Sequence, residues 1–242
     1  MNTDGSQVVM LAGVGPGLGA ALARLFTKHG CAVGLMARNT EYLNQLESEL
    51  VTNGYRAISL SADLTNPNRV QSAFSQLRER FGPTEILINH GSLAYWQGIL
   101  DVSPKEFEQV WRVSVLGALL CCQEAVPNMQ KEEKGTILFS GATSTVRGRK
   151  GAVDFSSAQF ARRGLADAMA RELWPQGIHV AHIIIDGVID TPRVRKQFNP
   201  DPDEPLLDPA EIAKSYWHLV QQQQNAWTFE LDLRPNREEF FE

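Results

Sequence analysis

Short apolar segments alternate along the chain with longer segments in which apolar residues recur every three to four positions. The first pattern is typical of buried strands and the second of amphipathic helices. Strands are expected at Gln7–Ala12, Ala32–Met36, Ala57–Leu60, Glu85–Asn89, Gly135–Ser140, Gly177–Ile185 and Trp227–Leu231. Helices are expected at Gly17–Gly30, Glu41–Thr52, Ser103–Asn128 and Phe155–Trp174, and starting at Asn66 and at Asp208.

Strands that alternate with helices predict βαβ units and a parallel sheet. The strand segments are continuously apolar, as expected when helices cover both faces of the sheet. We therefore predict an α/β fold: a single-domain, Rossmann-like, doubly wound fold over residues 1–242, with about seven parallel strands. Residues 190–209 are rich in proline and acidic side chains, and we expect them to form a mobile region that shapes a substrate site.

A glycine-rich segment lies between the first expected strand and the first expected helix. Its sequence, GVGPGLG, spans Gly13–Gly19. Glycines at this place let the backbone approach a pyrophosphate at the N-terminus of a helix. The residues expected to bind a dinucleotide here are Gly13, Gly15, Pro16, Gly17, Leu18 and Gly19.

The end of the second strand indicates which dinucleotide is preferred. An acidic residue at this point would bind the ribose 2′-hydroxyl of NAD, but the sequence has Ala37 followed by Arg38. A guanidinium suits a 2′-phosphate. The sequence therefore predicts NADP(H) in preference to NAD(H).

Together these motifs resemble the short-chain dehydrogenase/reductase family over nearly the whole chain. The pattern Gly13-x-x-x-Gly17-x-Gly19 is similar to that of the family, although Ala12 stands where the family usually has Thr. The resemblance implies the strand order 3-2-1-4-5-6-7 and a nicotinamide cofactor. It implies further cofactor contacts at Asp63, Leu64, Asn89, Gly91, Ile189 and Thr191.

The resemblance also implies a homodimer or homotetramer, paired through the helices around Arg112–Ala125 and Phe155–Trp174. Enzymes of the family move a hydride to or from a carbonyl carbon, and a Tyr beside a Lys moves the proton. Because the pKa of a Tyr is near 10 unless a cation lowers it, the Lys is a physical requirement of this chemistry.

All four catalytic positions of the family are replaced in this chain. The positions of the family's Asn, Ser, Tyr and Lys correspond to Ser114, Ala142, Phe155 and Gln159. Phe155 has no proton to give, and Gln159 carries no charge. Loss of a general acid costs about 10²–10⁴ in rate. The leading hypothesis is therefore a catalytically degenerate, NADP(H)-binding protein that senses the cofactor or binds a partner.

Two alternatives stay open. The protein could be an NADP(H)-dependent oxidoreductase for a carbonyl or alcohol substrate that uses other acid–base groups, with His90 and Tyr95 as weak candidates. The cleft could also have lost the dinucleotide and bind an anion through the basic segments Arg147–Lys150 and Arg193–Lys196. A third basic pair, Arg162–Arg163, is expected on the pairing helix, where it could form ion pairs between subunits.

Composition restricts the partners further. The net charge of −5 and the pI of about 5.6 argue against nucleic acid as a partner. The three cysteines lack metal-ligand spacing, so no metal site is expected, and we interpret them as reduced thiols. The apolar runs are shorter than the ~18 residues of a membrane span, and no signal sequence is evident. We expect a cytoplasmic protein with a small-molecule ligand, for which an anion is one of the alternatives, and no membrane partner.

Overall fold

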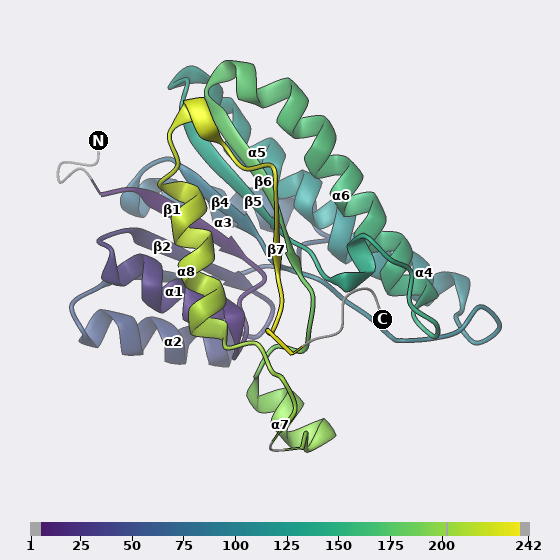
Figure 1. The fold of residues 1–242 in the computed structure, drawn as a ribbon. Helices are drawn as coiled ribbons and strands as arrows, with labels where there is room; N and C mark the ends of the chain where they lie inside the picture. The colour runs from purple at the N-terminus through teal and green to yellow at the C-terminus, as the bar shows by residue number, and fades with distance from the viewer. Residues whose placement is uncertain (1–5, 202, 238–242) are drawn as a thin grey trace.

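A seven-stranded parallel sheet forms the centre of the protein, in the order β3-β2-β1-β4-β5-β6-β7 (Figure 1). The structure is a computed structural model that describes residues 6–201 and 203–237. The strands are β1 (Val8–Ala12), β2 (Ala32–Ala37), β3 (Arg56–Ser61), β4 (Ile86–Asn89), β5 (Gly135–Ser140), β6 (Ile178–Ile185) and β7 (Glu230–Leu233). The predicted Rossmann-like fold, strand number and strand order are confirmed.

Helices cover both faces of this sheet, which explains why the central strands are mostly apolar and almost fully buried. One face is covered by α1 (Leu18–Lys28), α2 (Thr40–Thr52) and α8 (Pro209–Val220). The other is covered by α3 (Pro67–Phe81), α5 (Gly117–Lys131) and α6 (Val153–Leu173). In Figure 1, α8 lies alongside α1, with which it makes extensive contact. Every residue of β1 and β6 is buried between the two layers.

The expected helix at Ser103–Asn128 is interrupted. It consists of α4 (Pro104–Trp111), a π-helical turn at Arg112–Leu116, and α5. Ser103 begins α4 as a capping box with Glu106, as the sequence pattern indicates. The π turn adds an extra residue to the helical path and rotates the side chains that follow it.

This continuous helical segment, Pro104–Lys131, is long and apolar enough to cross a membrane by length and composition alone. Such a segment is also typical of a core helix. Cys121, Cys122, Ala125 and Met129 all lie in the hydrophobic core against the sheet. Its apolar character is thus explained by its packing within the domain.

Most boundaries differ from the sequence-based expectation by one or two residues, and two segments near the C-terminus differ more. The last strand begins at Glu230, whereas Trp227 stacks on His179 and precedes the strand. Within 190–209, a short helix, α7 (Pro192–Phe198), follows the N-cap Thr191. An isolated bridge joins Ile189 to Leu207 at the base of this segment. α7 projects from the body of the molecule in Figure 1.

Candidate functional site

A cleft of about 810 Å³ lies at the carboxyl ends of the central strands. Its walls come from the loops after β4, β5 and β6, from the start of α6 and from α7. Ligands of open α/β sheets bind at this edge, where the strand order reverses between β1 and β4. Clefts of roughly 300–1,000 Å³ are typical of small-molecule sites.

The predicted glycine loop has the geometry that a pyrophosphate site requires. Gly13 has a φ of 101°, and a Cβ there would lie 2.2 Å from the Cα of Gly91. The N–H groups of Gly13 and Val14 both donate to the carbonyl of Met36, which ties the loop to β2. No side chain caps α1 at Gly17, so its first turn of N–H groups faces the loop without a side-chain acceptor.

The loop also meets the segment after β6. A Cβ at Gly17 would lie 2.7 Å from Cγ2 of Thr191, so the glycine loop and Thr191 are in close contact. Ile189 lines the cleft beside them. The structure therefore brings together residues that the sequence separates by more than 170 positions.

Arg38 and Asp63 lie near one another on the far side of the glycine loop. Arg38 is exposed at the end of β2, and Asp63 is half-buried after β3. The backbone N–H of Thr65 donates to Asp63 at 2.9 Å and lowers the pKa of that carboxyl, and the charges of Arg38 and Arg112 lower it further. Leu64 contacts Gly91, where a Cβ would lie 2.3 Å from its Cδ1.

The positions that correspond to three of the family's catalytic residues, Ala142, Phe155 and Gln159, converge on the cleft. The ring of Phe155 lies against that of Trp96, with centroids 4.8 Å apart. Gln159 is buried, and its Oε1 has no hydrogen-bond partner. Ser114, the fourth position, is buried in the π turn, where its Oγ accepts a hydrogen bond from the N–H of Leu93 at 3.4 Å.

Two buried side-chain oxygen atoms of the cleft have no hydrogen-bond partner. They are Oε1 of Gln159 and Oγ of Ser144, which is 1% exposed and also lacks a partner. Buried polar atoms are almost always hydrogen-bonded in folded proteins. A ligand with hydroxyl groups, such as a ribose, would satisfy the Gln159 oxygen. The residues present thus fit a dinucleotide, with the glycine loop on its phosphates and Gln159 near its sugar.

His90 lines the floor of the cleft. Its Nδ1 lies 3.0 Å from Oγ of Ser140, which in turn lies 2.6 Å from the hydroxyl of Tyr216. Burial lowers the pKa of His90 to about 4, and the charge of Arg162 acts in the same direction. The imidazole is consequently neutral at pH 7 and can exchange hydrogen bonds, but it holds no extra proton to donate.

Tyr95 is not brought to the cleft. Its hydroxyl donates to Oε1 of Gln109 on α4 at 2.8 Å, and its backbone N–H donates to the carboxylate of Asp154 at 2.7 Å. Its neighbours Ala94 and Trp96 line the cleft instead. His90 is therefore in the cleft but neutral, and Tyr95 is outside it. Neither residue is placed to act as a general acid there.

The ion pair between subunits that the sequence left open for Arg162 is excluded by the burial of Arg162 within the chain, and the one for Arg163 stays a prediction. Arg162 is fully buried, and its guanidinium donates to the carbonyl oxygens of Asn89 and, at 2.9 Å, of Gly91. Burial lowers its pKa to about 10, so it stays charged at neutral pH. Arg163 forms a bidentate pair with Glu230 of β7 at 2.7 Å. Sequence periodicity gave no signal that Arg162 faces inward.

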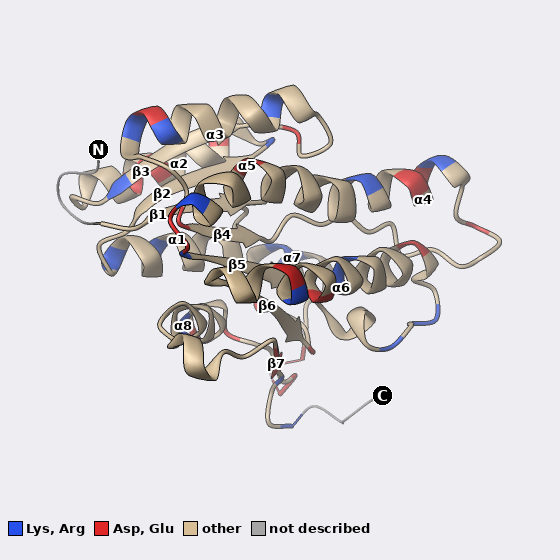
Figure 2. Cartoon of the chain, turned by 90° about the horizontal axis from the view of Figure 1, so that it is seen from above, with Lys and Arg blue, Asp and Glu red and all other residues tan. Residues whose placement is uncertain are grey.

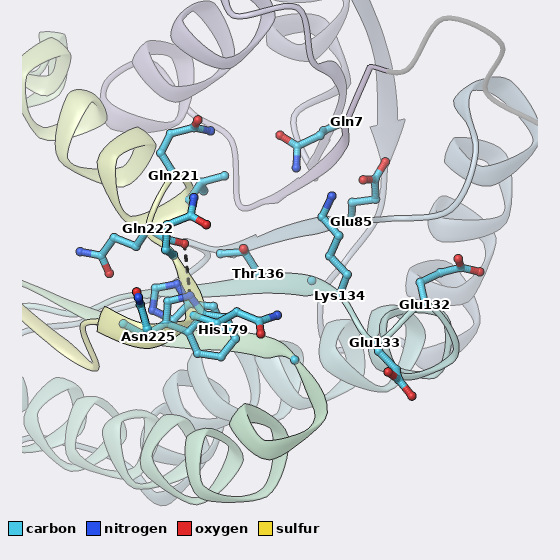
Figure 3. Close-up of a pocket in the computed structure, with 16 residues that line it drawn as sticks. Gln7, Glu85, Glu132, Glu133, Lys134, Thr136, His179, Gln221, Gln222 and Asn225 are labelled. Carbon is cyan, nitrogen blue, oxygen red and sulfur yellow. Dashed lines mark hydrogen bonds between the residues drawn. The ribbon is translucent and has the colours of Figure 1, made fainter.

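A second depression, of about 960 Å³, lies at the opposite edge, by the amino ends of the strands (Figure 3). Polar side chains line it, among them Glu85, Lys134, His179 and Gln222. None of the residues that the sequence predicts as functional is among its lining residues. Although it is slightly larger, we place the site at the carboxyl edge because the glycine loop and the three converging positions lie there.

Comparisons with known proteins agree with this geometry. Residues 7–202 match the family described as short chain dehydrogenase. An uncharacterized oxidoreductase of Staphylococcus aureus (strain N315) is 25% identical over 229 residues, which covers 95% of this chain and 97% of that protein.

Solved structures share the fold over the same extent. A short-chain dehydrogenase from Rhodopseudomonas palustris is 33% identical, with a TM-score of 0.82, and the match covers 95% of this chain and 98% of that one. L-sorbose reductase from Gluconobacter frateurii, complexed with NADPH and L-sorbose, superimposes with a TM-score of 0.86 at 20% identity, covering 97% and 98% of the two chains.

Proposed function

The chain belongs to the short-chain dehydrogenase family, and from that premise we propose that it binds NADP(H) but has lost the proton-transfer groups of its relatives. It would then serve as a cofactor-responsive binding protein. The glycine loop, the uncapped N-terminus of α1 and the exposed Arg38 support the cofactor assignment. Its best match in fold among the structures described above holds NADPH.

The observation that carries this proposal is which ionisable side chains line the cleft. Among the described residues that line it, the side chains that can ionise are His90, Arg149, Arg193 and Glu204. Neither a Tyr nor a Lys is in that set. Carbonyl reduction needs a proton for the developing alkoxide, and a guanidinium holds its protons too tightly to supply one. Phe155 and Gln159 leave this requirement unmet at the family's own positions.

A second function is favoured by one specific contact. His90 stands in the cleft with its Nδ1 bonded to Ser140. A neutral imidazole can polarise a carbonyl by donating a hydrogen bond, as occurs in other enzymes. The alternative is therefore an NADP(H)-dependent oxidoreductase in which His90 orients and polarises the substrate oxygen, and His90→Ala should then abolish turnover on a panel of carbonyl compounds.

Calorimetric titration with NADPH and then with NADH tests the primary proposal. We expect micromolar affinity for NADPH and at least tenfold weaker affinity for NADH. Arg38→Ala should remove most of this preference, because a guanidinium pairs with the 2′-phosphate that only NADPH carries. The control is Arg56→Ala. Arg56 lies at the start of β3, at the end of the β2–β3 pair that is opposite to Arg38. Failure of both dinucleotides to bind would overturn the proposal.

We further propose that the protein is cytoplasmic and forms a homodimer or homotetramer through α4, α5 and α6. Trp111, Leu119 and Phe160 stay exposed on these three helices. Large apolar side chains grouped on neighbouring helices are typical of subunit interfaces. Charged residues of both signs are distributed over the helices in Figure 2, and the net charge of −5 argues against nucleic acid as a partner.

A further inference from the structure

The mouth of the cleft exposes large apolar side chains from three separate segments. Trp96 in the loop after β4 is 52% exposed, Val188 after β6 is 43% exposed, and Phe198 at the end of α7 is 73% exposed. All three line the cleft, together with the inward-facing Leu93 and Leu206. Exposed apolar groups that rim a cavity mark a place where an apolar ligand is covered.

Trp96 is held there at a cost in backbone energy. Its φ of 60° lies in the left-handed region, which a bulky L-residue rarely adopts. The loop is fastened on both sides: the N–H of Tyr95 donates to Asp154 at 2.7 Å, and the N–H of Val153 donates to the carbonyl of Gln97 at 3.1 Å. Strain that the surroundings maintain in this way is concentrated at functional sites.

The same rim carries positive charge. The guanidinium carbon of Arg149 lies 5.9 Å from the centroid of the Trp96 ring, and Arg193 lines the cleft from α7. Glu204 is the acidic residue of the described lining. Two arginines and one glutamate give the lining a charge of +1, whereas the whole chain has −5. The cleft is therefore apolar along its walls and favours an anion at its mouth.

We propose that this half of the cleft binds a small molecule with an apolar body and a terminal carboxylate. The body lies between Trp96 and Phe155 on one wall and Val188 and Phe198 on the other, and the carboxylate pairs with the arginines of the rim. Arginine is suited to this because its planar donors match a carboxylate. The inference deepens the proposed function and rests on it, since the dinucleotide would lie on the glycine loop beside this cleft.

Calorimetry with octanoate, 1-octanol and octylammonium, on protein saturated with NADPH, tests the ligand class. We expect octanoate to bind at least tenfold more tightly than octanol and octylammonium to bind weakest. The double variant Arg149→Gln/Arg193→Gln should lose this tenfold preference and keep its affinity for octanol. The matched control Lys150→Gln/Lys196→Gln removes two neighbouring charges whose side chains are not among the lining residues, and should change neither affinity.

Trp96→Gly separates a ligand role from a structural one. Glycine adopts a φ of 60° without strain, which offsets part of the packing and chain entropy lost with the indole, so the variant should stay folded with a cooperative urea transition. Loss of the indole should nevertheless weaken both octanoate and octanol at least fivefold. A variant that is destabilised and binds both probes normally would show that Trp96 only supports the fold.

Equal affinity for octanoate and octanol, an effect of the control pair as large as that of the arginine pair, or no binding of any probe would each overturn the ligand class. NADPH titrated into the same preparations keeps the two proposals distinct. Retained NADPH binding with failed octanoate binding rejects only the carboxylate. If NADPH itself fails to bind, the proposed function fails, and the octanoate titration on unloaded protein still decides the ligand class.

Discussion

At the scale of single residues, the chemistry of the cleft depends on a few substitutions and on one buried charge. Phe155, where the proposed function places a lost proton donor, packs its ring on Trp96, and Gln159, where it places a lost cation, has an amide oxygen without a hydrogen-bond partner. Arg162, one turn further along α6, places its guanidinium behind the cleft floor instead, on the carbonyls of Asn89 and Gly91. A positive charge is thus present near the floor of the cleft, but its guanidinium is hydrogen-bonded to backbone carbonyl groups.

Restoring the missing groups tests whether they alone are lacking. In the triple variant Ala142→Ser/Phe155→Tyr/Gln159→Lys, a lysine would lower the pKa of the new tyrosine, and the serine would hold the substrate oxygen. We expect NADPH-dependent reduction of carbonyl compounds to appear, measured as loss of NADPH absorbance.

The matched control is Ala142→Ser/Phe155→Tyr/Gln159→Met, which has the tyrosine without the cation and should be at least 10²-fold slower, within the usual contribution of acid–base catalysis. A triple variant that folds, binds NADPH and stays inactive would mean that the shape of the cleft, rather than its proton donors, prevents the reaction.

At the scale of elements, the site is made where loops from different βα units cross. The glycine loop after β1 meets the loop after β4 at Gly13 and Gly91, and it meets the start of α7 at Gly17 and Thr191. These contacts leave no room for a side chain at Gly13. Gly15, in the same loop, has no atom within 4 Å of a Cβ placed on it.

Two alanine variants of the glycine loop therefore differ in whether the added methyl group has room. Gly13→Ala should lower the free energy of unfolding by about 2 kcal/mol or more, because its φ of 101° and the backbone of Gly91 both exclude a Cβ. Gly15→Ala should leave stability within about 0.5 kcal/mol and weaken NADPH binding, since the added methyl faces open space in the loop. Urea denaturation and calorimetry measure the two effects. Equal stability of both variants would contradict the predicted crossing of the loops.

At the scale of the whole molecule, burial sets the response to pH. Desolvation lowers the pKa of His90 and of His182 to about 4, and the positive charge of Arg162 adds to this in both cases. Above pH 6.5 both histidines are neutral in the folded and the unfolded protein. Between pH 6.5 and 4 the unfolded chain takes up these protons and the folded protein does not, so the free energy of unfolding falls as the pH falls.

Each histidine should contribute a slope of about 1.4 kcal/mol per pH unit once the pH is well below 6.5. In the His182→Asn variant, the number of protons taken up on unfolding between pH 6 and 5 should be smaller by about one. The slope of the free energy of unfolding against pH, measured in urea, should fall accordingly. A wild-type stability that does not vary over this range would contradict the burial of both imidazoles.

Assembly is the second property of the whole molecule. If α4, α5 and α6 pair two copies, light scattering after size exclusion should give at least twice the 26.9 kDa of one chain. Trp111→Glu/Phe160→Glu should then give a folded monomer, because two charges would be buried in the interface. Val51→Glu, on the exposed side of α2, should not change the mass. A monomeric wild type would refute the pairing.

The pattern of the sequence by itself determined the α/β fold and the position of the glycine loop, because periodicity and turn residues are local properties, whereas the strand order came from the resemblance to the family. The resemblance also assigned Ser114, Ala142, Phe155 and Gln159 to the family's catalytic positions, and that assignment stays a prediction. Only the tertiary structure decided that Arg162 is buried, that Tyr95 bonds to α4 and that Trp96 is strained beside Arg149. These features depend on which distant segments meet, and such contacts leave no periodic signal in the sequence.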